Sequence, residues 1–512
     1  MGPMQFSLVH RRTSQSFGTT NTARRLCVSA LFCLATLAIG CGEESSSGDT
    51  SSSPTPASVT TVKQAHKSSH RGSSRSHRRH HRRGRKYREA LVQDVRTLAA
   101  NHNVAPVSPA PQVRQELVDL GQALMFDKEL SGNRNMSCMT CHDASLLTDD
   151  NRSMSLGEGG LGLGAERVGG PIHSRNSLAL FNLHELEFFF WDGRLRRLPN
   201  GELLNPADEE LTPDMEAVFE FGPLSALGMF PVENVTEMRG IPGTNEVADA
   251  QNFTDVWAAL MARLGNIPQY RTMFEAAYPG TQFNDMTFAH ASNAMAGFML
   301  STFEARESPW QQFLRGDDHA MNIEQLRGAK SFFEDGCGNC HSGTALSDMQ
   351  FHNTGLAQFG PGRAHGIDDT DDFGAGDFPE HNAPNYSFRT APLFNVALTG
   401  PWGHIGQFND LREFVAHYDD PVAKLYSYSI IDNIDASEYY LADMDIENLW
   451  EEIDGGFQGP LRQEAALGRT TNPRCRKIFE DMVEEAGEMK ESETKFFAPN
   501  RSEGLAPISL PA

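Results

Sequence analysis

The stretch LVDLGQALMFDKELSGNRNMSCMTCH, residues Leu117–His142, ends in a C-x-x-C-H motif, and LRGAKSFFEDGCGNCH, residues Leu326–His341, repeats the arrangement. Before the first motif, Leu117, Leu120 and Leu124 recur at helical spacing. Two thiols one helical turn apart can each add to a vinyl group of one porphyrin, while the histidine gives its imidazole to the iron. The sequence therefore predicts two covalent c-type haems, held by Cys138, Cys141 and His142, and by Cys337, Cys340 and His341.

A four-cysteine zinc site is the alternative that these cysteines raise. The two pairs stand about 200 residues apart, and each is followed by a histidine, which favours haem. The chain has only eight cysteines in 512 residues, too few for a disulfide scaffold. Cys475 is left over, and we expect it to be a buried free thiol.

The remaining pattern of apolar residues is helical. Between the motifs, one stripe at helical spacing predicts the core face of a longer helix: Phe288, Ala291, Met295, Phe298, Met299 and Phe303. No sustained alternation predicts a large sheet. We therefore predict an all-α fold with two cytochrome c-like domains, each carrying one covalent haem, behind a disordered N-terminal tether. The predicted boundaries are 112–310, 311–470 and a C-terminal tail at 471–512.

The first 111 residues are predicted to be an export signal and a linker. Arg24 and Arg25 precede an apolar run at 26–40 of signal-peptide length, too short to span a bilayer. The following Cys41 resembles the lipidated cysteine of bacterial lipoproteins, with plain signal cleavage after residues 1–41 as the alternative. We expect a periplasmic or cell-envelope protein that touches the membrane only through a lipid anchor. The Ser-rich and His/Arg-rich residues 42–111 are predicted to be a disordered linker.

Charge is distributed unevenly along the chain. The formal net charge is −23, yet 11 of the 44 Lys and Arg side chains fall within Lys63–Arg88. Residues 90–512 contain 29 basic and 63 acidic side chains, a balance of −34. Such a body repels nucleic acid and favours a cationic partner, such as a basic electron-carrier protein.

From about Leu117 to Tyr418, the chain resembles the bacterial di-haem cytochrome c peroxidase and MauG family. Besides both haem motifs in order, the resemblance rests on LGQALMFD at Leu120–Asp127, Arg175-Asn176, FWDGR at Phe190–Arg194, Glu237-Met238 and APLFNVALTGP at Ala391–Pro401. In this family the N-terminal, peroxidatic haem reacts with hydrogen peroxide, and the C-terminal haem stores or relays electrons. The resemblance implies a peroxidase whose electron donor is a small redox protein (a cytochrome c or cupredoxin) or, as in MauG, a protein substrate. It also allows a homodimer.

The resemblance assigns roles to single residues. Trp191 matches the tryptophan that lies between the two haems and helps electrons pass. Glu237 matches the acid/base on the distal side of the peroxidatic haem. Asn176, Thr399 and Pro401 match positions that bind a calcium ion through one side-chain oxygen and two backbone carbonyls, which are hard ligands suited to calcium.

Two departures from the peroxidase pattern favour MauG-like chemistry. Glu158, in the Gly-rich stretch 157–170 that we expect to be a flexible loop, replaces a second histidine ligand, so the first haem is expected to be five-coordinate. Tyr418 stands where peroxidases have an axial Met and MauG has a Tyr, whose phenolate favours ferric iron. His404 and His417 are rival ligands of this haem. The alternative function is a di-haem electron-transfer or redox-sensing lipoprotein without peroxidase turnover.

Overall fold

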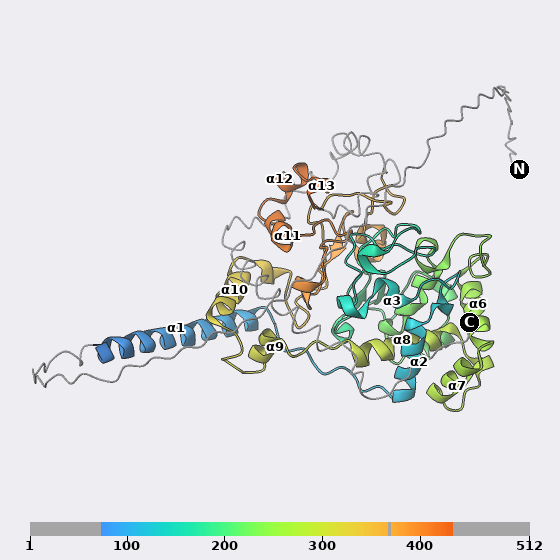
Figure 1. Cartoon of the computed structure of the whole chain (residues 1–512), viewed down its shortest axis with the longest axis horizontal. Coiled ribbons are helices and arrows are strands. Elements are labelled where there is room, and N and C mark those ends of the chain that lie inside the picture. The colour runs from blue at the N-terminus through green and yellow to red at the C-terminus, as the bar shows by residue number, and fades with distance from the viewer. Residues whose placement is uncertain (1–72, 367–369, 434–512) are drawn as a thin grey trace, which may run out of the picture. The chain divides into compact units, whose positions relative to one another are not determined.

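The computed structural model describes residues 73–366 and 370–433 (Figure 1). Several predictions concern residues outside these ranges. They are the signal peptide with Cys41, the linker before residue 73, residues 434–470 of the second predicted domain, and the tail with Cys475.

Helices dominate the described chain. Those of ten residues or more are α1 (Ser73–Asn101), α2 (Gln115–Phe126), α6 (Phe253–Gly265), α7 (Pro268–Ala277), α8 (Phe288–Thr302) and α10 (Ile323–Glu334). The shorter α-helices are α3 (Cys138–Cys141), α4 (Pro213–Glu216), α5 (Pro223–Ala226), α9 (Pro309–Leu314), α11 (Leu411–His417), α12 (Pro421–Tyr426) and α13 (Ile430–Asn433). Within the described part of the chain, none of the helices has the combined length and hydropathy of a membrane-spanning segment.

The strands are two or three residues long: β1 (Phe188–Phe189), β2 (Leu195–Arg197), β3 (Leu203–Leu204), β4 (Phe351–His352) and β5 (Phe388–Arg389). They form an antiparallel sheet in the order β1-β2-β3 and a separate antiparallel pair of β4 and β5. The predicted helical fold is confirmed at this level. Strands this short show no alternating pattern, so the sequence did not predict them.

The main hydrophobic core lies around α2 and α8, and it contains the whole predicted stripe from Phe288 to Phe303. Leu117, Leu120 and Leu124 of α2 are fully buried in the same core. A β-carbon on Gly121 would collide with the carbonyl oxygen of Ala294 in α8, so the glycine allows the two helices to touch.

Helix α10 stands before the second motif as α2 stands before the first, which confirms the predicted order of helix and cysteines. Its Leu326 and Phe333 are buried in two smaller apolar clusters, apart from the main core. A further cluster joins Met154 to apolar residues between 357 and 428. The division into domains at 112–310 and 311–470 stays a prediction.

The predicted disordered linker is wrong over residues 73–111, because this stretch includes helix α1. Leu91, Val92 and Val95 of α1 are buried against residues that include Leu326 of α10. Lys330 of α10 adds an ion pair with Asp94 at 2.6 Å. The sequence prediction missed this stripe at helical spacing because Arg and His dominate the composition just before it.

Replacing Gly121 by alanine is expected to lower the free energy of unfolding by about 1–3 kcal/mol, the usual cost of an added group in a packed core. The added methyl group has to push against the backbone of α8. Thermal unfolding measures the effect. Gly84→Ala is the control, since nothing lies within 4 Å of a β-carbon there, and it should leave stability unchanged or slightly raised. An unchanged Tm for Gly121→Ala would contradict the close contact.

Candidate functional site

Helix α3 presents Cys138 and Cys141 within one helical turn. Ser137 caps this short helix, and its backbone amide donates to Oγ1 of Thr140 at 2.9 Å. The four cysteines of the described chain are all free, so none of these thiols is used in a disulfide.

The ring of His142 is oriented by the backbone that follows it. Its Nδ1 lies 3.1 Å from the carbonyl oxygen of Thr148 and 3.5 Å from Oγ of Ser177. Burial lowers the pKa of His142, which keeps the imidazole neutral. A neutral ring whose Nδ1 is bonded to a carbonyl leaves Nε2 for a metal, so the residues of the first motif fit a haem.

The second motif repeats this arrangement. Cys337 lies in the 3-10 helix η10 (Cys337–Asn339), directly after α10, and Cys340 follows it. Nδ1 of His341 lies 2.9 Å from the carbonyl oxygen of Leu346, and burial lowers the pKa of this imidazole too. These residues therefore also fit a haem.

Glu237 lies on the short π-helix η8 (Val235–Arg239) and interacts electrostatically with Cys138 and His142 of the first motif. Burial raises the pKa of Glu237, but the charge and hydrogen bond of His173 outweigh it, so the net shift is downward. The carboxylate is therefore ionised at neutral pH.

His173 holds this carboxylate in place. Its Nε2 lies 3.4 Å from Oε2 of Glu237, while its Nδ1 lies 3.1 Å from the carbonyl oxygen of Arg175. The sequence analysis did not connect the two side chains. They stand 64 residues apart, and no local pattern pairs residues at that distance.

The Gly-rich stretch 157–170 lies against the backbone of Glu237. The amide of Glu158 donates to the carbonyl oxygen of Glu237 at 2.7 Å, and a β-carbon on Gly157 would collide with the backbone of η8. The Glu158 side chain is buried and accepts a hydrogen bond from Nδ2 of Asn135 at 2.9 Å. Arg167 donates to three backbone carbonyls in and next to this stretch. These contacts fix the loop, which corrects the prediction of a flexible one.

Trp191 joins the two segments that contact the motif histidines. Its Nε1 donates to the carbonyl oxygen of Asn176 at 3.0 Å, and its own carbonyl accepts from the amide of Arg389 at 2.9 Å. Two residues after each partner, a backbone group hydrogen-bonds a motif histidine: Leu178 for His142, and Ala391 for His341. One residue therefore connects both predicted haem sites through the backbone.

A buried ion-pair network includes Asp192, the residue directly after Trp191. Arg175 donates to Asp192 at 2.5 Å and to both carboxylate oxygens of Asp372 at 2.6 and 2.8 Å. Burial raises the pKa of each carboxyl, but Arg175 outweighs it, lowering the pKa of Asp372 to about 2 and that of Asp192 well below its usual range. The network therefore stays charged at neutral pH.

Of the predicted calcium ligands, Asn176 is buried beside His404. Its amide donates to the carbonyl oxygen of His404, and its side-chain Nδ2 donates to that of Arg152, both at 2.9 Å. These bonds leave the Asn176 side-chain oxygen available to a cation. Thr399 and Pro401 stand a few residues before His404, and the calcium site stays a prediction.

Tyr418 directly follows α11 and interacts electrostatically with Cys340 and Cys337 of the second motif. Tyr418 is 38% exposed, but the protein around its phenol partly withdraws it from water. This withdrawal, and then the two sulfurs, raise the pKa of Tyr418, while a hydrogen bond with Thr354 opposes the shift. The sulfurs carry no charge once they are thioethers, so this contribution disappears in a haem-loaded protein.

The two rival ligands have other partners. Nε2 of His417 lies 2.8 Å from the carbonyl oxygen of Thr354. The ring of His404 stacks on Phe388 at 3.7 Å, and its Nε2 lies 3.2 Å from Nε2 of Gln358. Of the three candidates, Tyr418 is the one that interacts with both motif cysteines.

The sequence analysis also missed a charged pair beside the second motif. Nε2 of His352 lies 2.9 Å from Oδ2 of Asp348, and ligand atoms of both residues lie within 4.8 Å of the Cys340 sulfur. The hydrogen bond that His352 donates to Asp348, followed by its hydrogen bond with Cys340, raises the pKa of His352 to about 10. This places an imidazolium next to the predicted point of haem attachment.

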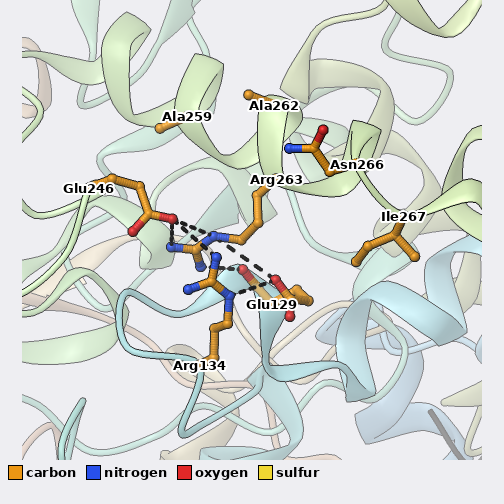
Figure 2. Close-up of a pocket in the computed structure, with 8 residues that line it drawn as sticks. All are labelled: Glu129, Arg134, Glu246, Ala259, Ala262, Arg263, Asn266 and Ile267. Atoms are coloured by element: carbon orange, nitrogen blue, oxygen red, sulfur yellow. Dashed lines mark hydrogen bonds and ion pairs between the residues drawn. The ribbon is translucent and has the colours of Figure 1, made fainter. Parts of the chain in front are cut away.

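A pocket of about 410 Å³ on α6 has a structural role. Figure 2 shows its two arginines and two glutamates pointing toward one another. Arg134 pairs with Glu129 at 2.9 Å, and Arg263 pairs with Glu246 at 2.7 Å. Arg263 also donates to three backbone carbonyls at residues 129–132, so it fixes the loop between α2 and the first motif.

The chain is similar to several known proteins. Residues 115–319 match the family model described as di-haem cytochrome c peroxidase. The chain is 30% identical over 304 residues to the cytochrome c551 peroxidase of Pseudomonas aeruginosa, covering 59% of this chain and 72% of that protein. It is 26% identical over 337 residues to the methylamine utilization protein MauG of Methylorubrum extorquens, covering 64% and 77%. A solved structure of a MauG-like protein associated with microbial copper homeostasis aligns with a TM-score of 0.45 at 23% identity, over 62% of this chain and 81% of that one.

Replacing Arg175 by methionine is expected to lower the free energy of unfolding of the haem-loaded protein by about 3–5 kcal/mol at pH 7, because it removes a buried partner of Asp192 and Asp372. In the wild type, the lowered carboxyl pKa gives stability that is present above the unfolded pKa of about 4 and is lost as the pH falls towards about 2. The variant lacks this contribution, so the difference should shrink in acid. Denaturant unfolding at several pH values measures it.

Arg315→Met is the control, since Arg315 is paired with the exposed Glu307 at 3.0 Å and the loss should stay below about 1 kcal/mol. Equal losses for the two variants would contradict a special role for the buried network.

Proposed function

This chain belongs to the di-haem cytochrome c peroxidase family, and from that premise we propose that it reduces hydrogen peroxide at the haem held by Cys138, Cys141 and His142. Members of this family are peroxidases that carry two haem c groups. Cys337, Cys340 and His341 would hold the second haem, which would supply electrons to the first. The observation that carries the proposal is the ionised Glu237 beside the first motif, with His173 positioning its carboxylate.

Glu237 performs the proton transfer. The bound haem iron supplies the peroxide-binding position and the electron chemistry. The carboxylate Oε2 accepts a proton from hydrogen peroxide and returns it to the departing oxygen, which leaves as water. His173, 3.4 Å away, keeps the carboxylate ionised and directed. Two electrons and two further protons complete the conversion of one peroxide to two waters.

Trp191 is the proposed route between the two sites. Its ring is fixed by the bond from Nε1 to the carbonyl of Asn176, and its carbonyl is fixed by the amide of Arg389. An indole held between the two histidine-contacting segments suits electron transfer between them. Calcium held by Asn176, Thr399 and Pro401 would further tie these segments together.

Tyr418 would hold the iron of the second haem through its phenol oxygen. A tyrosine oxygen favours higher oxidation states of iron, so the pair of haems would hold oxidising equivalents, as in MauG-like chemistry. Its position near both motif cysteines supports this assignment over His404 and His417. The electrons are then replaced by a small redox protein or by a protein substrate.

The acidic body and the N-terminal segment complete the proposal. A cationic donor suits the balance of −34 over residues 90–512. Export to the cell envelope, with a lipid on Cys41, suits haem attachment outside the cytoplasm. An electron carrier without turnover is the alternative, and the acid/base geometry at Glu237 favours the enzyme.

Replacing Glu237 by glutamine is expected to lower kcat/KM for peroxide by about 10²–10⁴-fold, because the amide cannot accept the proton. In the wild type, kcat/KM should fall when the pH is lowered through the pKa of Glu237, since protonation removes the base. Steady-state peroxide reduction with a small-molecule electron donor measures both effects.

Glu166→Gln is the control, because this glutamate is exposed in the neighbouring Gly-rich stretch. It should keep wild-type kinetics. Haem content confirms that both variants are loaded. A Glu237→Gln variant with full activity would exclude the proposed acid/base.

Replacing Tyr418 by phenylalanine is expected to change the electron paramagnetic resonance signal of the second haem in the oxidised protein, because an iron ligand is lost. The high-spin signal expected from an open first haem should persist. His417→Gln is the matched variant from the same helix end, and its spectrum should resemble that of the wild type. A signal that changes with His417 and not with Tyr418 would assign the ligand to the histidine.

A further inference from the structure

Positive charge exceeds negative charge next to Trp191. Of the side chains involved, Arg175, Arg389, Asp192 and Asp372 are buried, and Arg194 and Arg363 are partly exposed. Two carboxylates face four guanidinium groups in what we call the arginine cluster: Arg175, Arg194, Arg363, Arg389, Asp192 and Asp372. Asp192 lies 2.5 Å from Arg175, 2.6 Å from Arg194 and 3.7 Å from Arg363, and Asp372 pairs with Arg175. His404 beside the cluster is neutral at pH 7, because burial lowers its pKa to about 3. The cluster therefore has an excess of two positive charges.

Arg389 is the member of this cluster without a carboxylate partner. It is only 4% exposed. Its Nε donates to the carbonyl oxygen of Phe190 at 3.3 Å, and its Nη1 has no hydrogen-bond partner among the described residues. Burial lowers the pKa of Arg389 to about 10, and the charge of Asp192 opposes this only partly. The guanidinium is still charged at neutral pH, so it lacks a counterion.

Arg175 and Arg389 each stand shortly before a backbone group that contacts a motif histidine. Arg175 stands three residues before Leu178, whose backbone contacts His142. Arg389, on β5, stands two residues before Ala391, whose backbone contacts His341. Protein carboxylates satisfy Arg175, whereas Arg389 has none. The unmatched charge therefore lies on the segment that contacts the second motif.

A buried charge without a partner costs several kcal/mol, so such a position is stable when a ligand brings the missing anion. Each haem c brings two propionate carboxylates. We propose that Nη1 of Arg389 binds a propionate of the haem held by Cys337, Cys340 and His341. The bond is a charge-assisted hydrogen bond, among the strongest available to a side chain. This inference rests on the second haem of the proposed function, and it is independent of peroxide chemistry.

The contact has an electrochemical consequence. A propionate paired with Arg389 stays ionised, and its charge is balanced. Without the guanidinium, the uncompensated anion favours ferric over ferrous haem. The pKa of the propionate also rises, so the potential of that haem becomes dependent on pH.

The test is a spectroelectrochemical titration of each haem in the loaded wild type and in Arg389→Gln and Arg389→Lys. In the glutamine variant, the ratio of reduced to oxidised second haem at a fixed potential should fall about tenfold, equivalent to about 59 mV for one electron. Its dependence on pH should become steeper. In the lysine variant, the ratio of reduced to oxidised second haem should lie between the ratios of the wild type and the glutamine variant. Arg315→Gln, which removes an exposed charge, should match the wild type.

Resonance Raman spectra of the propionate bending band give a second readout. The band should shift in both Arg389 variants, so the lysine variant decides the question if the glutamine variant fails to take up haem. Unchanged potentials and bands would overturn the proposal. A wild-type potential that follows phosphate concentration, with this dependence lost in Arg389→Gln, would instead assign the site to a dissolved anion. A lack of peroxide turnover in the wild type would overturn the proposed function and leave these results intact.

Discussion

The arrangement of the whole site depends on the buried guanidinium of Arg175. Its two carboxylate partners come from different parts of the chain, since Asp192 follows 17 residues later and Asp372 follows 197 residues later. Three residues after Arg175, the backbone of Leu178 contacts His142. Trp191 directly precedes Asp192 in sequence. A single side chain thus fixes the predicted relay residue beside the first haem site. Removing one partner of such a buried ion pair is strongly destabilising, because the other charge is left buried and uncompensated.

Trp191 also connects the first predicted haem site to the second one. Its backbone carbonyl holds the amide of Arg389, and that segment contacts His341. Trp191 is therefore hydrogen-bonded to both segments that contact a motif histidine. Each segment contains a buried arginine, and the two arginines differ in whether a protein carboxylate pairs with them. Arg175 is neutralised by the protein, and Arg389 is not. Such a difference lets one fold give its two haems different electrostatic surroundings, which suits a division between peroxide chemistry and electron storage.

The sequence predicted those features that depend on local pattern. Helical periodicity predicted the buried face of α8. The spacing of cysteines predicted both haem sites, and these stay predictions. Resemblance to a family supplied Glu237, Trp191 and Tyr418. Partners that meet only after folding were not predictable. His173 stands 64 residues from Glu237, and no periodicity connects them. Helix α1 was missed for another reason, because its basic composition hid a short apolar stripe.

We propose that the two haem sites act as one unit, with oxidising equivalents shared through Trp191. Rapid mixing of the oxidised wild type with one equivalent of hydrogen peroxide, without an electron donor, tests it most directly. Optical and electron paramagnetic resonance spectra report each haem separately. We expect the signals of both haems to change together. A change confined to the first haem, or no change at all, would contradict it.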